Sequence, residues 1–175
     1  MDAIVIYDSY MVKVKNKHRL KRKEIKELLE RIHQDIDSDF VFPNDNIEKG
    51  TLDQCDLIFI DGAPLFFEKD ADVFFTLIGL LHAKPRDRFV VVDMGAVRFV
   101  INGADVMAPG IVDADESIQE KDMVWICDEQ HRKPLAVGRA LVSGKQMKIS
   151  TQGKAITVLH YIGDPLWEQT KAALQ

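Results

Sequence analysis

The second half of the sequence is a series of short apolar runs separated by turns rich in Gly, Pro and Asp. The runs have the length of single β-strands and span 89–93, 124–127, 135–141 and 155–160. Short strands that alternate with turn residues in this way are typical of a small barrel or sandwich. The segment 96–101, between Gly95 and Gly103, is expected to form a short helix. This half of the chain is therefore predicted to be mostly β.

The first half mixes strand-like and helix-like patterns. From Lys23 the apolar residues recur at the spacing of one helical face, at Ile25, Leu28, Leu29, Ile32 and Ile36. Five other runs are expected to form strands: 4–7, 11–14, 40–42, 57–60 and 65–67. Residues 61–64 are interpreted as a turn. The run 73–82 fits a buried helix, although its start at Phe74 and Phe75 also fits a strand.

A short polar segment separates these two patterns. Residues 84–88, Lys-Pro-Arg-Asp-Arg, contain a proline and no apolar residue, as is common at domain boundaries. We therefore predict an N-terminal α+β domain over 1–86, a β-barrel domain over 87–168 and a tail over 169–175. The chain of 175 residues is long enough for two small domains of this kind.

The charge of the chain is unevenly distributed. The net charge is −5, but residues 13–31 hold nine Lys or Arg against three Glu, a local charge of +6, while the remainder carries −11. A basic segment on an acidic protein is typical of a contact with an anionic partner, of which RNA is the first candidate. The alternative is a solvated turn and helix start with no partner.

Several classes of protein are not indicated. The two cysteines, Cys55 and Cys127, do not form a disulfide framework or a metal motif, and the five histidines are scattered without paired ligand spacing. No metal or cofactor is therefore expected. The longest apolar stretch, 73–81, is too short to span a bilayer, and a cytoplasmic location is the expectation.

Residues 138–145, GRALVSGK, imitate a phosphate-binding loop without matching it. Five residues separate the two glycines instead of four, and Gln146 stands where a Ser or Thr would hold magnesium. The segment is interpreted as a strand followed by a turn. There is also no GxGxxG sequence, so neither a nucleotide triphosphatase nor a dinucleotide-binding protein is predicted.

Two aspartates, Asp61 and Asp93, each follow an apolar strand and precede Gly within two residues. A carboxylate in this position can be catalytic, but it equally often forms a turn by accepting backbone N–H bonds. No second titratable residue is placed beside either one by the local sequence. Catalysis is not predicted.

The second half strongly resembles a PUA domain, an RNA-binding module. The resemblance is carried by VVVDMGAVRFVINGADVMAPGI (90–111), DMVWICDE (122–129), LAVGRAL (135–141) and GKAITVLHYIGDPLW (153–167). The order strand, Asp-x-Gly-Ala, helix, Gly-Ala, four residues, Pro-Gly is more specific than any single glycine motif. The resemblance implies a PUA-type β-barrel.

The first half is similar to the pre-PUA region of the translation-factor family that contains the malignant-T-cell-amplified protein, including its archaeal two-domain members. The similarity is carried by the basic start, the amphipathic helix and FIDGAPLFF (59–67). In that family an α+β domain precedes the PUA domain, and members work with initiator tRNA and the small ribosomal subunit. The resemblance implies these partners for the present chain.

The PUA resemblance also implies an RNA-binding face. Gly103 and Ala104 carry almost no side chain, so a sugar–phosphate backbone can approach the main chain and accept N–H bonds there; the alternative is that these glycines serve packing and turn geometry. Arg98 and Lys154 are expected phosphate partners. The full set expected to bind RNA is Gly95, Arg98, Asn102, Gly103, Ala104, Pro109, Gly110, Gly153 and Lys154, together with Lys21, Arg22 and Lys23 of the basic segment.

The predicted function is binding of structured RNA, either tRNA or rRNA, in translation or RNA maturation, without catalysis and without binding DNA or a membrane. Residues 88–167 hold nine Lys or Arg against ten Asp or Glu, so the basic segment 13–31 is expected to supply much of the salt-dependent affinity. One alternative is a tRNA-modification enzyme, or its accessory subunit, that uses Asp61 or Asp93. The other is an adaptor that binds proteins only.

Overall fold

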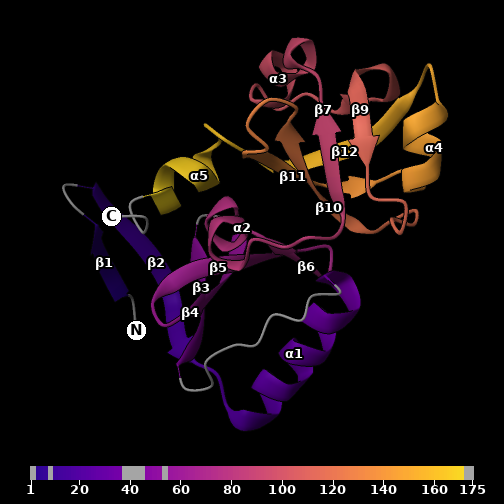
Figure 1. Ribbon diagram of the computed structural model, residues 1–175. Helices are drawn as coiled ribbons and strands as arrows, with labels where there is room; N and C mark the ends of the chain where they lie inside the picture. Colours follow the sequence, from indigo (N-terminus) through magenta and orange to yellow (C-terminus); the bar gives the residue numbers. More distant parts are fainter. Residues whose placement is uncertain (1–2, 8–9, 37–45, 53–54, 172–175) are drawn as a thin grey trace. The chain divides into compact units, whose positions relative to one another are not determined.

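The computed structural model describes residues 3–7, 10–36, 46–52 and 55–171 (Figure 1). The chain divides into two compact units, one comprising residues 1–83 and 168–175 and the other Lys84–Trp167. The division falls at the start of the polar segment 84–88. The finer limits of 1–86, 87–168 and 169–175 stay predictions.

The first unit is built on an antiparallel sheet whose described strands follow one another in chain order, from β1 to β6. Its elements are β1 (Ala3–Tyr7), β2 (Tyr10–Arg19), α1 (Arg22–Ile36), β3 (Ile47–Leu52), β4 (Cys55–Ile60), β5 (Ala63–Lys69), β6 (Asp72–Phe75) and α2 (Leu77–Ala83). Helices and antiparallel strands in one unit confirm the predicted α+β class. The expected strand at 40–42 lies outside the described residues.

Helix α1 buries the apolar stripe that predicted it. Leu28, Ile32 and Ile36 are at most 5% exposed, and the helix lies against β6 (Figure 1). Arg31 fixes its position, since Nη1 donates to Glu68 Oε1 and Nη2 donates to the carbonyl of Ala71, both at 2.6 Å. The opposite face of the helix carries exposed Lys and Glu in i, i+4 pairs.

The apolar run 73–82 forms a strand and then a helix. Thr76 makes the change: its Oγ1 donates to the carbonyl of Pro64 at 2.6 Å and accepts from the N–H of Gly79 at 2.9 Å. The hydroxyl therefore ties the end of β6 to β5 and caps the first turn of α2. The strand interpretation is therefore correct for the start of the run, and the helix interpretation is correct for the rest of it.

The second unit contains a nearly closed, barrel-like sheet with the strand order β8-β12-β11-β10-β7-β9. Its elements are β7 (Phe89–Val92), α3 (Met94–Val100), β8 (Val106–Met107), a 3-10 turn η1 (Ala108–Gly110), β9 (Ile111–Ala114), β10 (Met123–Asp128), β11 (Pro134–Ala140), α4 (Gly144–Ile149), β12 (Lys154–Tyr161) and α5 (Pro165–Thr170). β7 and β10 are parallel, and the other described pairs are antiparallel. The predicted barrel is confirmed.

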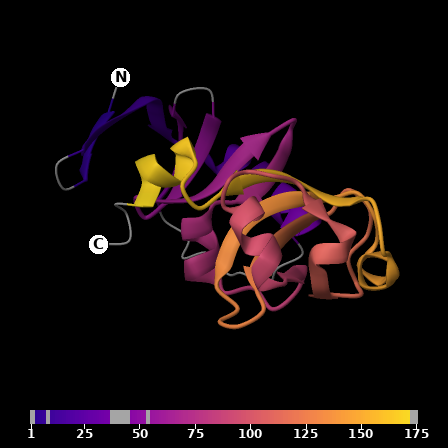
Figure 2. The ribbon, with the colours of Figure 1, turned by 90° about the horizontal axis from the view of Figure 1, so that it is seen from above.

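The core of this unit is formed by fully buried aliphatic side chains of the sheet, among them Val90, Val92, Val124, Ile126 and Ile156. Helices α3 and α4 of this unit lie apart from each other (Figure 2). The end of GRALVSGK was expected to form a turn, but α4 begins there with Ser143 as its N-cap. Ser143 Oγ accepts from the N–H of Gln146, whose side chain accepts from the N–H of Ser143. This capping box is what turns the segment into a helix.

Candidate nucleic-acid interface

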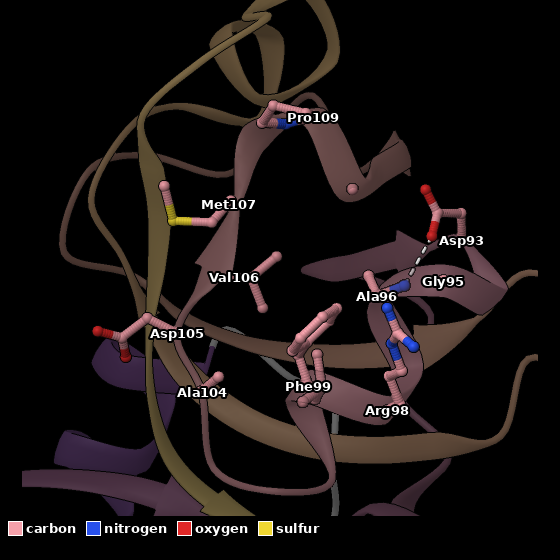
Figure 3. Close-up of a pocket in the computed structure, with 12 residues that line it drawn as sticks. Asp93, Gly95, Ala96, Arg98, Phe99, Ala104, Asp105, Val106, Met107 and Pro109 are labelled. Carbon is pink, nitrogen blue, oxygen red and sulfur yellow. Dashed lines mark hydrogen bonds between the residues drawn. The ribbon is translucent and has the colours of Figure 1, made fainter.

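Helix α3 starts at one of the two aspartates considered for catalysis. Asp93 follows β7, and its Oδ1 accepts from the N–H of Ala96 at 2.7 Å (Figure 3). Asp93 is therefore the N-cap of α3, which is the turn-forming interpretation of this carboxylate. Asp61, the other one, lies in the turn between β4 and β5 with a φ of 50°. The Asp93 carboxylate therefore has a local structural task, and Asp61 occupies a turn position through its backbone.

A pocket of about 690 Å³ lies between α3 on one side and β8 with η1 on the other. It brings together five of the residues that the PUA resemblance implies for RNA binding: Gly95, Arg98, Ala104, Pro109 and Gly110. Figure 3 shows four of them, Gly95, Arg98, Ala104 and Pro109, around the same hollow. A Cβ at Gly110 would lie 3.0 Å from the Cβ of Ala96, so this glycine lets η1 approach α3 closely.

The pocket has an apolar lining that was not predicted from the sequence. Phe99 on α3 and Met107 on β8 are 53% and 49% exposed, although both are large apolar side chains. They line the pocket together with buried Val106 (Figure 3). Exposed apolar side chains gathered at one concave site are typical of a binding surface. The available signal was an aromatic residue directly beside an arginine on a helix of about two turns.

Arg98 supplies positive charge at this pocket. It is exposed, and its guanidinium carbon lies 4.7 Å from the centre of the Phe99 ring. Among the described residues, no carboxylate lies within ion-pair distance of Arg98. The guanidinium donors are therefore available to an anion, while the cation–π contact orients the group over the aromatic ring.

Lys154 does not line this pocket itself, but it is paired with a residue that does. Its Nζ lies 2.6 Å from Oδ2 of Asp105, a residue that lines the pocket. Partial burial acts to raise the pKa of Asp105, but the bonds from Lys154 and from the N–H of Val158 outweigh it, and the pKa lies below its ordinary value. Lys154 thus differs from Arg98 as a phosphate partner. A phosphate that bound to Lys154 would lie next to the charged carboxylate of Asp105 and be repelled by it.

Gly103 does not offer the open main chain that was expected from its lack of a side chain. Its φ is 80°, and its N–H and that of Ala104 donate to the carbonyls of Val100 and Phe99, each at 3.0 Å. These two bonds are the Schellman motif that ends α3. The donors expected to bind phosphate are therefore used within the chain, and the space beside Gly103 is filled by Tyr161.

Two other expected residues have different surroundings. Asn102 is exposed and its Nδ2 donates to the carbonyl of Arg98 at 2.6 Å, so it also helps to end α3. Gly153 has a φ of 92° and no atom within 4 Å of its Cβ position. It precedes Lys154, and its carbonyl accepts from the N–H of Ala108 at 2.9 Å. Of the four glycines expected to bind RNA, Gly153 is therefore the one with open space beside its backbone.

The expected residues of the basic segment belong to the first unit. Lys21, Arg22 and Lys23 are exposed at the junction of β2 and α1. The N–H of Lys21 donates to Glu24 Oε2 at 2.7 Å, which caps the helix. Lys23 Nζ lies 3.8 Å from Glu27, whereas no ion pair of Lys21 or Arg22 is formed with the described residues. Lys21 and Arg22 are the stronger candidates for phosphate contacts here.

Neither a metal-binding cluster nor a membrane-spanning helix is found in the part of the chain that is described. No group of three or more His, Cys, Asp or Glu residues there is arranged to hold a metal ion. None of the described helices is both long enough and apolar enough to cross a membrane. The candidate sites for binding RNA are therefore the pocket beside α3 and the basic junction of β2 and α1.

Comparison with known protein families matches each unit to a separate domain. Residues 88–162 match the PUA domain, and residues 16–83 match a domain of unknown function, DUF1947. A structure of a hypothetical protein from Pyrococcus horikoshii superimposes with a TM-score of 0.80 at 39% identity, covering 88% of this chain and 99% of that one.

Curated relatives align with this chain over 64% to 98% of their own length. An uncharacterized protein of Methanocaldococcus jannaschii is 45% identical over 159 residues, which is 89% of this chain and 98% of that one. Translation machinery-associated protein 20 of Saccharomyces cerevisiae is 33% identical over 122 residues, 66% of this chain and 67% of its own. Malignant T-cell-amplified sequence 1 of Rattus norvegicus is 29% identical over 119 residues, 64% of either chain.

Proposed function

Because this chain belongs to the family of two-domain PUA proteins that includes Translation machinery-associated protein 20, we propose that it binds structured RNA through the pocket beside α3. The RNA is a tRNA or an rRNA, and the role is in translation, in the cytoplasm and without catalysis by this chain. The name of the yeast relative, which associates it with the translation machinery, supports this direction. The small ribosomal subunit or a translation factor is the further partner proposed.

The observation that carries the proposal is the combination of an uncompensated arginine with exposed apolar side chains at one pocket. Arg98 can donate two parallel N–H bonds to a phosphate. Phe99 and Met107 provide an apolar surface on which a base or the ribose can rest. The fixed guanidinium over the Phe99 ring places the charged and the apolar contact next to each other.

The second unit alone is weakly suited to electrostatic attraction. Residues 88–167 carry one more acidic than basic residue, whereas binding of nucleic acid depends on neutralised phosphates. We therefore propose a division in which the pocket beside α3 recognises a local feature of the RNA. Lys21 and Arg22, which are exposed and unpaired with any described carboxylate, add salt-dependent affinity from the first unit.

The direct test is the affinity of the full chain for a fluorescently labelled tRNA transcript, measured by anisotropy with the wild type and with Arg98→Met. We expect the Kd of the variant to rise roughly 5- to 30-fold, as for loss of one arginine contact, and the salt dependence to weaken by about one phosphate contact. An rRNA helix, labelled in the same way, distinguishes the two classes of RNA.

Arg132→Met is the matched control, because Arg132 is exposed in the turn after β10, does not line the pocket, and its loss changes the net charge equally. We expect it to leave the Kd nearly unchanged. Equal Kd values for the wild type and Arg98→Met would contradict the proposal. Retention of a protein partner, but no RNA, in a pull-down treated with and without ribonuclease would favour the adaptor instead.

A further inference from the structure

We infer that Asp105 controls where phosphate binds in the pocket beside α3: it neutralises Lys154 on β12 and leaves Arg98 on α3 to attract the phosphate of an RNA strand. The inference rests on the proposed function, since it concerns the same pocket. It makes Asp105 a selectivity residue that restrains RNA affinity instead of adding to it.

The position of Asp105 is fixed by two bonds. Oδ2 lies 2.6 Å from Lys154 Nζ, and Oδ1 accepts from the N–H of Val158 at 2.9 Å. The Val158 N–H belongs to the backbone of β12, so the carboxylate is tied to the sheet as well as to the lysine. It therefore stays beside Lys154 when an anion approaches.

The pair is accessible to a ligand. The side chains of Lys154 and Asp105 are 48% and 29% exposed, so a phosphate can reach the ammonium group. It would then lie within a few ångströms of the carboxylate, and like charges at that separation repel each other appreciably near a protein surface. Because the bonds from Lys154 and Val158 keep the pKa of Asp105 below its ordinary value, the carboxylate is charged at neutral pH.

The pocket is consequently asymmetric in charge. Arg98 lies on the α3 side without a carboxylate among the described residues in ion-pair distance. Asp93, the other carboxylate that lines the pocket, has its Oδ1 engaged by the N-terminus of α3. The β8 side combines the neutral Lys154–Asp105 pair with Met107. We expect the phosphate to lie at Arg98 and an uncharged part of the nucleotide to lie toward β8.

The test is a double-mutant cycle in the full chain, with the same labelled tRNA transcript. Asp105→Asn keeps the shape and can still accept from the N–H of Val158, but it frees the ammonium of Lys154. We expect this variant to bind the transcript roughly 3- to 10-fold more tightly at 0.1 M salt. Its plot of log K against log salt concentration should be steeper by about 0.7–0.9, the value for one additional phosphate contact.

Two further variants show whether any gain acts through the lysine. Addition of Lys154→Met to Asp105→Asn should return the Kd and the salt slope to near their wild-type values, because the β8 side is then neutral again. Glu120→Gln, which removes an exposed carboxylate away from the pocket, is the matched control for net charge. Thermal unfolding of each variant verifies that it is folded.

The inference is overturned if Asp105→Asn binds no more tightly than the wild type, if Glu120→Gln gives the same gain, or if the gain persists in the double variant. These outcomes differ from failure of the proposed function, in which Arg98→Met binds as the wild type does. If Arg98→Met weakens binding and Asp105→Asn does not strengthen it, the pocket binds RNA but Asp105 has no selectivity role.

Discussion

The ring of Tyr161 lies directly against the backbone of Gly103. A Cβ at residue 103 would be 2.7 Å from ring atoms Cε1 and Cζ and 2.8 Å from Oη. Real Cβ atoms do not approach other atoms so closely, and the φ of 80° at Gly103 is itself unfavourable for any residue with a side chain. The end of β12 and the end of α3 therefore meet at a position that requires glycine.

Gly103→Ala is expected to destabilise the chain by about 2–4 kcal/mol, from about 1–2 kcal/mol of backbone strain and a comparable steric term. The measurement is the free energy of unfolding in urea. Gly153→Ala is the control, because Gly153 has a similar φ of 92° but open space at its Cβ position. Gly153→Ala should lose only the part of the unfolding free energy that comes from backbone strain. If both variants lost the same unfolding free energy, the steric contact with Tyr161 would be contradicted.

The regular elements of this chain were largely predictable from local patterns. Helix α1 follows from its apolar spacing, and the strands β4, β7, β10, β11 and β12 follow from short runs in which apolar residues predominate. β3, Ile47–Leu52, was missed because its sequence, IEKGTL, has apolar residues only at its ends. β8 has only two residues and takes its place from pairing with β12, which no local pattern encodes.

The candidate site was predictable in part. The order of Asp, Gly-Ala, Gly-Ala and Pro-Gly gave the PUA resemblance, and the short helix expected over 96–101 corresponds to α3. Five of the residues expected from that resemblance do meet at one pocket. The ion pair of Lys154 with Asp105 and the contact of Tyr161 with Gly103 were not predictable, because they join residues far apart in the sequence. Both depend on the register of β12. The ion pair neutralises Lys154, and the tyrosine ring closes the space beside Gly103.

Asp164 supports the end of the second unit through a buried cluster of bonds. Its Oδ2 lies 2.7 Å from His160 Nδ1, and its two oxygens accept from the N–H groups of Tyr161 and Trp167. Asp164→Asn should lower the free energy of unfolding at pH 7 by about 2 kcal/mol, since a buried charge-assisted bond is lost. Urea unfolding of both proteins gives this difference.

The effect of this substitution should depend on pH. Burial acts to raise the pKa of Asp164, but the bonds from His160, Trp167 and Tyr161 lower it further than burial raises it, so the folded pKa lies below the ordinary value of 3.8. Stability from a lowered carboxylate pKa is complete above the unfolded pKa and is lost as the pH falls toward the folded one. The difference between wild type and variant should thus shrink below about pH 4; a constant difference down to pH 2 would contradict it.

Cys127 is expected to resist alkylation in the native chain. It is fully buried, and burial raises the pKa of its thiol to about 11. At pH 8 the reactive thiolate fraction is then roughly 200-fold smaller than for a free cysteine. Mass spectrometry of peptides after iodoacetamide treatment should show modification of Cys127 only when urea is present. Equal rates in native and unfolded chains would exclude a buried thiol.

Substitution of the basic junction should reduce the salt dependence of RNA binding. In Lys21→Gln/Arg22→Gln/Lys23→Gln, the loss should come mainly from Lys21 and Arg22, because Lys23 lies 3.8 Å from Glu27. Two lost phosphate contacts correspond to a slope of log K against log salt concentration that is about 1.4–1.8 less steep. Anisotropy titrations of the labelled tRNA transcript between 50 and 200 mM salt, roughly the range over which this dependence is large, measure it.

The matched control changes the net charge equally but in the second unit, away from the pocket. Lys121, Lys133 and Lys145 are exposed and do not line the pocket beside α3, so their replacement by Gln should leave the slope nearly unchanged. If both triple variants reduce the slope by the same amount, the attraction depends on the overall charge of the chain, and Lys21 and Arg22 have no particular role. If neither does, the first unit contributes no phosphate contacts, and Arg98 must account for the salt dependence that remains.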